Sequence, residues 1–174
     1  MIELLILYSI ISKELTMYGI KKYIDKFFAP YTKPSFGVIK PALTRLEKEF
    51  YISKRKTMSE GGKQSIYYSI NKDGHEKIKE LLLKSFSKNP IQFFADARIK
   101  IACSSALSDE ERNIFFHKLK NQTLEHKFEA ENIINDETLS MSFYQRIAMD
   151  NAICEYNNLA VLIENLEKEN AGNS

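Results

Sequence analysis

The 174 residues suffice for one compact unit or two small ones, and the abundant Leu, Ile, Phe and Tyr side chains can fill a core. The net charge of +2 hides a split between the halves of the chain. Residues 1–90 hold 17 Lys and Arg against 9 Asp and Glu, giving +8, while residues 91–174 hold 8 against 14, giving −6. A basic first half favours contact with a polyanion, although both halves could equally be ordinary solvated surfaces.

The residue types that carry chemistry argue against several classes of protein. Cys103 and Cys154 lie far apart and neither has a CxxC partner, so we expect reduced thiols rather than a disulfide or a metal site. The three His residues lack metal-ligand spacing, and neither a phosphate-binding loop nor a Ser, His and acid arrangement is recognisable. We therefore expect no metal, no cofactor and no enzymatic activity.

The first expected element is the apolar segment 1–12, MIELLILYSIIS. It carries Glu3, lacks a basic leader and is too short to span a bilayer, so it is typical of neither a signal peptide nor a membrane anchor. We expect a buried helix in a cytoplasmic protein. Apolar residues nearly encircle this helix, so one side should pack on its own domain and the other, through Leu4 and Leu5, on a second copy of the chain.

A second helix is expected from Thr16, a candidate N-cap, to about Phe28. Its inward side chains should be Ile20, Ile24, Phe27 and Phe28. A proline-bounded turn then leads into a third helix.

The third helix is expected within PSFGVIKPALTRLEKEFYI, residues 34–52, with Ser35 as its N-cap. Steps of four, three and four place the apolar residues Ile39, Leu43, Leu46 and Phe50 on one face. The opposite face is polar and basic and carries Phe36, Lys40, Thr44 and Lys48. Pro41 breaks a local rule, because an interior proline crowds the carbonyl group four residues back, here that of Gly37. Such violations tend to occur at special sites.

A basic β-hairpin should follow, because residues alternate in type over 52–58 and 65–70 and glycines lie in the connection 59–63. Three helices followed by a hairpin within about seventy residues is the element order of a winged helix-turn-helix domain. The third helix is then the recognition helix and the hairpin is the wing.

Several motifs in this region resemble those of the PadR family of transcriptional regulators. They are Met17-Tyr18-Gly19, Pro34-Ser35, Gly37, Pro41-Ala42-Leu43, Arg45-Leu46-Glu47, Gly62-Lys63 and Tyr67-Tyr68. The chain departs from the usual family strings at Tyr18, Ile20, Lys40 and Gln64. The resemblance implies a DNA-binding repressor that acts as a homodimer, and family members often respond to phenolic acids, drugs or other small aromatic molecules.

The expected contacts with double-stranded operator DNA follow from this placement. Basic side chains supply affinity through phosphates, while a few residues on the helix face, here Lys40 and Thr44, should contact base edges. Tyr67 should pack under the wing rather than reach a phosphate. The full set of expected DNA contacts is Ser35, Phe36, Lys40, Thr44, Arg45, Lys48, Lys54, Arg55, Lys56, Lys63 and Gln64.

The second half of the chain is expected to be helical. Asn71 is a candidate cap for a helix before a linker at 85–90, after which the composition turns acidic. A helix should begin at Ile91, and Ser108 with Glu111 forms a candidate capping box for a long helix that ends near Ile134. The expected fold is therefore mainly α with a small β-hairpin: a winged helix-turn-helix domain over 1–88 and a C-terminal helical dimerisation domain over 89–174.

A final helix is expected over about 141–169, with apolar residues at heptad-like spacing. We predict that these residues hold two chains together: Met149, Ile153, Tyr156, Ala160, Ile163 and Leu166. The alternative is a helical hairpin formed within one chain with the helix over 109–134, which would leave a monomer.

Aromatic residues in the second half could line an effector pocket, although their spacing equally suits ordinary helix packing, which is the interpretation that we favour. They are Phe93, Phe94, Phe115, Phe116, Tyr144 and Tyr156. A different hypothesis for the whole chain is a helical protein-interaction module on a winged-helix scaffold that does not bind DNA specifically. Weak retention on duplex DNA at low salt would favour that alternative.

Overall fold

The computed structural model describes residues 1–58, 62 and 64–172, and the chain divides into two compact units. Unit 1 comprises Met1–Lys84 and Ile91–Ala106, and unit 2 comprises Ser85–Pro90 and Leu107–Ser174. Each unit is described by itself. Among the described residues, no helix combines the length and the apolar character needed to cross a membrane.

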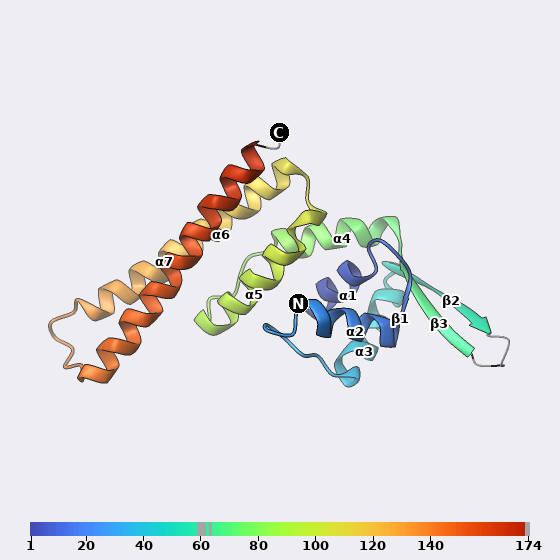
Figure 1. Cartoon of the computed structure of the whole chain (residues 1–174), viewed down its shortest axis with the longest axis horizontal. Coiled ribbons are helices and arrows are strands. Elements are labelled where there is room, and N and C mark those ends of the chain that lie inside the picture. Colours follow the sequence, from blue (N-terminus) through green and yellow to red (C-terminus); the bar gives the residue numbers. More distant parts are fainter. Residues whose placement is uncertain (59–61, 63, 173–174) are drawn as a thin grey trace. The chain divides into compact units, whose positions relative to one another are not determined.

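Unit 1 contains short helices and a small sheet (Figure 1). Its elements are α1 (Ile2–Ser9), β1 (Leu15–Thr16), α2 (Met17–Phe27), α3 (Phe36–Lys48), β2 (Ile52–Met58), β3 (Gln64–Ile70), α4 (Lys72–Leu83), α5 (Pro90–Cys103) and a 3-10 turn (Ser104–Ala106). The mainly helical fold with a winged hairpin is confirmed.

The sheet has three strands rather than the two that we predicted. β2 and β3 pair in antiparallel register from Ile52 opposite Ile70 to Met58 opposite Gln64, and β1 adds to the other edge of β3. A strand of two residues is too short to show the alternation on which sequence prediction depends, so β1 was not expected. The expected turn residues Ser59, Glu60, Gly61 and Lys63 lie outside the described residues.

α1 is the centre of the core of unit 1. Leu4, Leu5, Ile6 and Leu7 are at most 1% exposed, and the helix contacts α2, α3 and α4. The nearly continuous apolar surface of this helix is therefore covered by its own unit. At the end of α5, burial raises the pKa of the Cys103 thiol to about 12, so this cysteine remains protonated at neutral pH.

α3 buries the face that its apolar spacing predicted, with Ile39, Leu43 and Leu46 at most 2% exposed. The prediction that Phe50 continues this face is wrong. The helix ends at Lys48, Phe50 adopts a φ of 59°, and its side chain is 76% exposed. The inward placement of Phe27 is also wrong, because this last residue of α2 is 53% exposed while Phe28 is buried.

The expected caps differ in how they act. Thr16 accepts a hydrogen bond from the amide of Gly19, as predicted. Ser35 and Asn71 occupy N-cap positions without a side-chain cap bond. The Asn71 amide instead donates to the carbonyl oxygen of Phe50 at 2.9 Å, and its oxygen accepts from the Ser53 hydroxyl group, so Asn71 connects the start of α4 to the start of the wing.

Unit 2 is a helical hairpin in which α6 (Asp109–Ile134) and α7 (Phe143–Gly172) lie side by side (Figure 1). The predicted capping box is present, with Ser108 Oγ accepting from the Glu111 amide and the Glu111 carboxylate accepting from the Ser108 amide. At the open end, Asn170 accepts from Arg112 and donates to Asn113. Polar contacts thus join the two helices in addition to the apolar side chains that pack between them.

Candidate nucleic-acid interface

The outward face of α3 is the first component of the candidate site. Because successive helical residues are about 100° apart, the residues opposite the buried stripe follow steps of four, three and four. Those most directly outward are Gly37, Pro41, Thr44 and Lys48, all exposed. Lys40 and Arg45 lie on either side of this line and are also exposed. The outward face of α3 is therefore formed mostly by residues with small side chains and is bordered by cations.

Three of the predicted cations form ion pairs within unit 1. Lys54 on β2 contacts the Glu47 carboxylate of α3 at 2.6 Å, and Arg45 of α3 contacts Glu3 of α1 at 3.1 Å. Arg55 pairs with Glu14, which precedes β1. These pairs connect α1 to α3, α3 to the wing, and the β1 segment to the wing.

The ionisation of the paired cations follows from these contacts. The hydrogen bond from Glu47 raises the pKa of the Lys54 ammonium group, and that from Glu14 raises the pKa of the Arg55 guanidinium group. Burial, followed by the nearby Glu47 carboxylate, raises the pKa of Tyr68, which lies opposite Lys54 in the sheet. All three groups therefore keep their neutral-pH ionisation states well into the alkaline range.

Lys40, Lys48 and Lys56 differ from these cations, because each is exposed and makes no ion pair with any residue that the structure describes. They are the cations of α3 and β2 most available to an external anion. Lys63 lies outside the described residues, and Gln64 is exposed opposite Met58 at the far end of the wing.

The remaining predicted contacts are exposed but differ in the groups that they offer. Ser35 and Phe36 lie at the start of α3, and Phe36 is 42% exposed. The Thr44 hydroxyl group donates to the carbonyl oxygen of Lys40 at 3.1 Å, so its hydrogen is already used within the helix. Tyr67 is half-buried beneath Arg55, whose guanidinium carbon lies 5.6 Å from the ring centroid, as expected for a packing role.

The predicted DNA contacts did not include three further exposed residues of α2 and α3. Gly37 and Pro41 lie on the outward line of α3, and Tyr18 is 70% exposed in the first turn of α2. Helical geometry alone would have identified the first two, because both lie opposite the buried stripe. Nothing in the sequence distinguished Tyr18 from a buried tyrosine.

The residues predicted for dimerisation lie in two different places. Leu4 and Leu5 are buried in unit 1, each 1% exposed. Tyr156 and Ile163 are at most 4% exposed in the seam between α6 and α7, and the other four members are half-buried: Met149, Ile153, Ala160 and Leu166. The intramolecular hairpin, given above as the alternative, describes where α7 packs.

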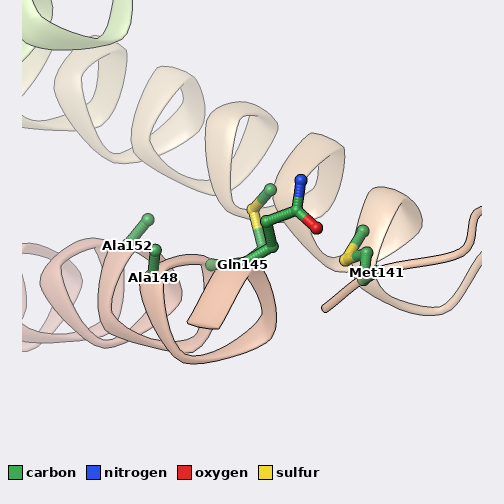
Figure 2. A pocket seen from close by; sticks show the side chains of 5 residues that line it. Met141, Gln145, Ala148 and Ala152 are labelled. Atoms are coloured by element: carbon green, nitrogen blue, oxygen red, sulfur yellow. The ribbon is translucent and has the colours of Figure 1, made fainter. Parts of the chain in front are cut away.

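The six candidate effector-binding aromatic residues do not line the apolar hollow of unit 2. Phe93, Phe115, Phe116 and Tyr156 are core residues, whereas Tyr144 is 82% exposed. The hollow lies in unit 2 and has a volume of about 360 Å³ (Figure 2). Its lining residues are Met141, Gln145, Ala148, Met149 and Ala152.

No group of three or more His, Cys, Asp or Glu side chains suited to a metal ion occurs within residues 1–58, 62 and 64–172.

Comparison with known proteins identifies one family. The model of the transcriptional regulator PadR-like family matches residues 6–80, a span that contains the outward face of α3 and the wing. No curated protein matches the chain.

Several solved structures are similar. PadR of Bacillus subtilis in complex with operator DNA is 17% identical, with 96% of each chain covered and a TM-score of 0.45. A PadR-like transcriptional regulator from Bacillus cereus is 32% identical, with 45% of this chain and 74% of that chain covered and a TM-score of 0.39. Bacillus subtilis PadR in complex with p-coumaric acid is 17% identical, with 98% of each chain covered and a TM-score of 0.42.

The difference between paired and available cations predicts different salt dependences for two lysines of the same strand. Replacing Lys56 with Ala should reduce the slope of log affinity against log salt by about 0.9, the value for one phosphate contact. Replacing Lys54 with Ala should change the slope by less than half as much, because Glu47 already neutralises Lys54. Titration of a duplex over a series of salt concentrations measures both slopes, and equal changes would contradict the distinction.

Proposed function

Because the chain belongs to the PadR-like family of transcriptional regulators, we propose that it is a cytoplasmic, homodimeric repressor that binds operator DNA sequence-specifically. The family consists of transcriptional regulators and not of enzymes. The observation that carries the proposal is the exposed, cation-flanked face of α3 beside the basic strand β2. A regulator held on an operator by these elements represses by excluding other proteins from the same DNA.

The physical support comes from the arrangement of charge and shape. Lys40 lies beside the outward line of α3 and Lys48 lies at its end. Lys56 extends the cationic surface onto the wing. Phosphate contacts by such side chains supply affinity and register, while the outward line of the helix meets base edges in the major groove. The Glu47–Lys54 pair helps to keep α3 and the wing in one orientation, so both can engage the same duplex.

The primary test is retention on duplex DNA. The full chain should bind random duplex at low salt and should lose affinity steeply as salt rises, and selection from a random library should yield a consensus sequence. The competing interaction-module hypothesis expects weak retention and no consensus. Replacing both Lys40 and Lys48 with Ala should weaken binding to all duplexes, whereas replacing both Lys88 and Lys118, two exposed lysines of unit 2, with Ala provides a matched charge control.

Homodimerisation is proposed through the side of α7 that faces away from α6. Phe143, Ile147, Cys154 and Val161 are separated by steps of four, seven and seven, and we name them the outer stripe. Three of them are 70%, 52% and 57% exposed in the single chain, and Cys154 is exposed as well. Apolar side chains in such a row are typical of an interface, and pairing two chains places two recognition helices on half-sites roughly 34–36 Å apart.

The dimer proposal predicts the behaviour of a variant in which both Ile147 and Val161 are replaced by Glu. The parent should sediment as a dimer at micromolar concentration, and the variant should sediment as a folded monomer with greatly weakened operator binding. Helical circular dichroism should persist, because both side chains are more than half exposed in the single chain. Leu162→Glu adds a charge at a side chain that is 45% exposed and lies about 100° around α7 from Val161, outside the outer stripe, so it should leave the dimer intact. A monomeric parent would contradict the proposal.

An effector site is proposed at the hollow of unit 2, where Ala148 and Ala152 leave apolar space beside the polar Gln145 side chain (Figure 2). A small aromatic molecule with one polar group fits this combination. Bacillus subtilis PadR, one of the similar structures, is in complex with p-coumaric acid.

The effector proposal predicts that a phenolic acid raises the melting temperature of the parent but not that of Ala148→Trp, because the indole fills the hollow. Glu169→Trp, at the other end of α7, is the matched control and should respond as the parent does. A differential scanning measurement with p-coumaric acid and related acids gives the three responses. An equal shift in the parent and in Ala148→Trp would place the ligand elsewhere.

A further inference from the structure

The centre of the outward line of α3 carries little hydrogen-bonding capacity. Gly37 has no side chain, Pro41 presents only ring CH₂ groups and has no amide hydrogen, and the Thr44 hydroxyl hydrogen is used by the Lys40 carbonyl oxygen at 3.1 Å. The Thr44 oxygen can still accept a hydrogen bond, and the γ-methyl group is the apolar group of this residue. Gly37, Pro41 and Thr44 thus form an exposed row of mainly apolar groups along α3, which we name the apolar line.

Gly37 leaves space that the fold itself does not use. A Cβ atom at this position would have the Ser35 hydroxyl oxygen, at 3.5 Å, as its sole neighbour within 4 Å, which is ordinary van der Waals contact. Glycine is also a poor helix former, so alanine would suit the helix better. The absence of a side chain is thus not required by packing, but it does allow an outside group to approach the backbone closely.

The chemistry of base edges limits what the apolar line can recognise. In the major groove, guanine, adenine and cytosine offer hydrogen-bond donors or acceptors, whereas thymine adds a 5-methyl group that apolar side chains contact. A line of one glycine, one proline ring and one methyl group cannot make bidentate hydrogen bonds through its side chains. It can surround a methyl group.

We propose that the apolar line of α3 recognises the 5-methyl groups of thymine, so that thymines in each half-site are specified by methyl contact rather than by hydrogen bonds. This inference rests on the proposed DNA-binding function. Lys40 and Lys48, which flank or continue the line, then contact phosphates or the neighbouring bases. The inference specifies the expected contact of Thr44 with a base edge, because it assigns that contact to the methyl group of Thr44.

The test uses the full-length protein and a duplex operator selected from a random library. Each thymine is replaced in turn by uracil, which lacks only the 5-methyl group. At one or two positions per half-site the affinity should fall about fourfold, the factor that corresponds to about 0.8 kcal/mol for one buried methyl-sized group. Uracil placed outside the half-sites is the control for changes in DNA shape and should have no effect.

Two variants of Thr44 assign the effect to this residue. Thr44→Ser keeps the hydroxyl group and removes the methyl group. At one position, the ratio of the affinities for the thymine and uracil operators should therefore fall to about one. Thr44→Val keeps a methyl group and removes the hydroxyl group, so that ratio should stay near fourfold. The opposite pattern, in which Ser retains the preference and Val loses it, would overturn the inference.

The outcomes separate this inference from the proposed function. A consensus sequence without any uracil effect would overturn methyl recognition while the DNA-binding function stands. Failure to select any consensus would overturn both. If uracil weakens the parent, Thr44→Ser and Gly37→Ala by the same factor at every position, another part of the protein senses the methyl groups and the inference is wrong. Thermal melting of each variant establishes that it is folded.

Discussion

The side chains of α1 fill the centre of unit 1, and the placement of α3 depends on them. Leu4, Leu5, Ile6 and Leu7 are almost completely buried and the helix contacts α2, α3 and α4. Removing one such side chain from a core typically costs about 2–5 kcal/mol, which is a large part of the stability of a small domain. Because Ile39, Leu43 and Leu46 point into the same core, the opposite face of α3 must point outward.

The ion pairs of unit 1 help to orient α3 relative to α1 and the wing, and they contribute little to stability. The pairs formed by Lys54 with Glu47 and by Arg45 with Glu3 are partly exposed, and such pairs contribute about 0–1 kcal/mol each. They nevertheless join α3 to the wing and to α1. Carboxylates at positions 3, 14 and 47 therefore divide the basic surface into cations that hold the fold together and cations that remain available for phosphate.

In unit 2, α7 has two apolar sides, of which one packs against α6 and the other is exposed. The seam residues Tyr156 and Ile163 are buried where α7 meets α6, whereas Ile147 and Val161 of the outer stripe remain exposed. An exposed row of apolar residues on a 30-residue helix is what a second chain can cover. The hairpin and a dimer are therefore compatible, because they use different sides of α7.

The amino-acid sequence by itself determined the helical limits near Thr16 and Ser108, the buried stripe of α3 and the paired strands of the wing, because periodicity and capping are local properties. Only the tertiary structure decided that Leu15–Thr16 forms a third strand, that Phe50 is exposed and that the predicted seam of α7 packs on α6. It also decided which wing cations are paired, since Glu14 and Arg55 are 41 residues apart in the chain. Contacts between distant segments leave no periodic trace in the sequence, so their partners emerge only when the chain is folded.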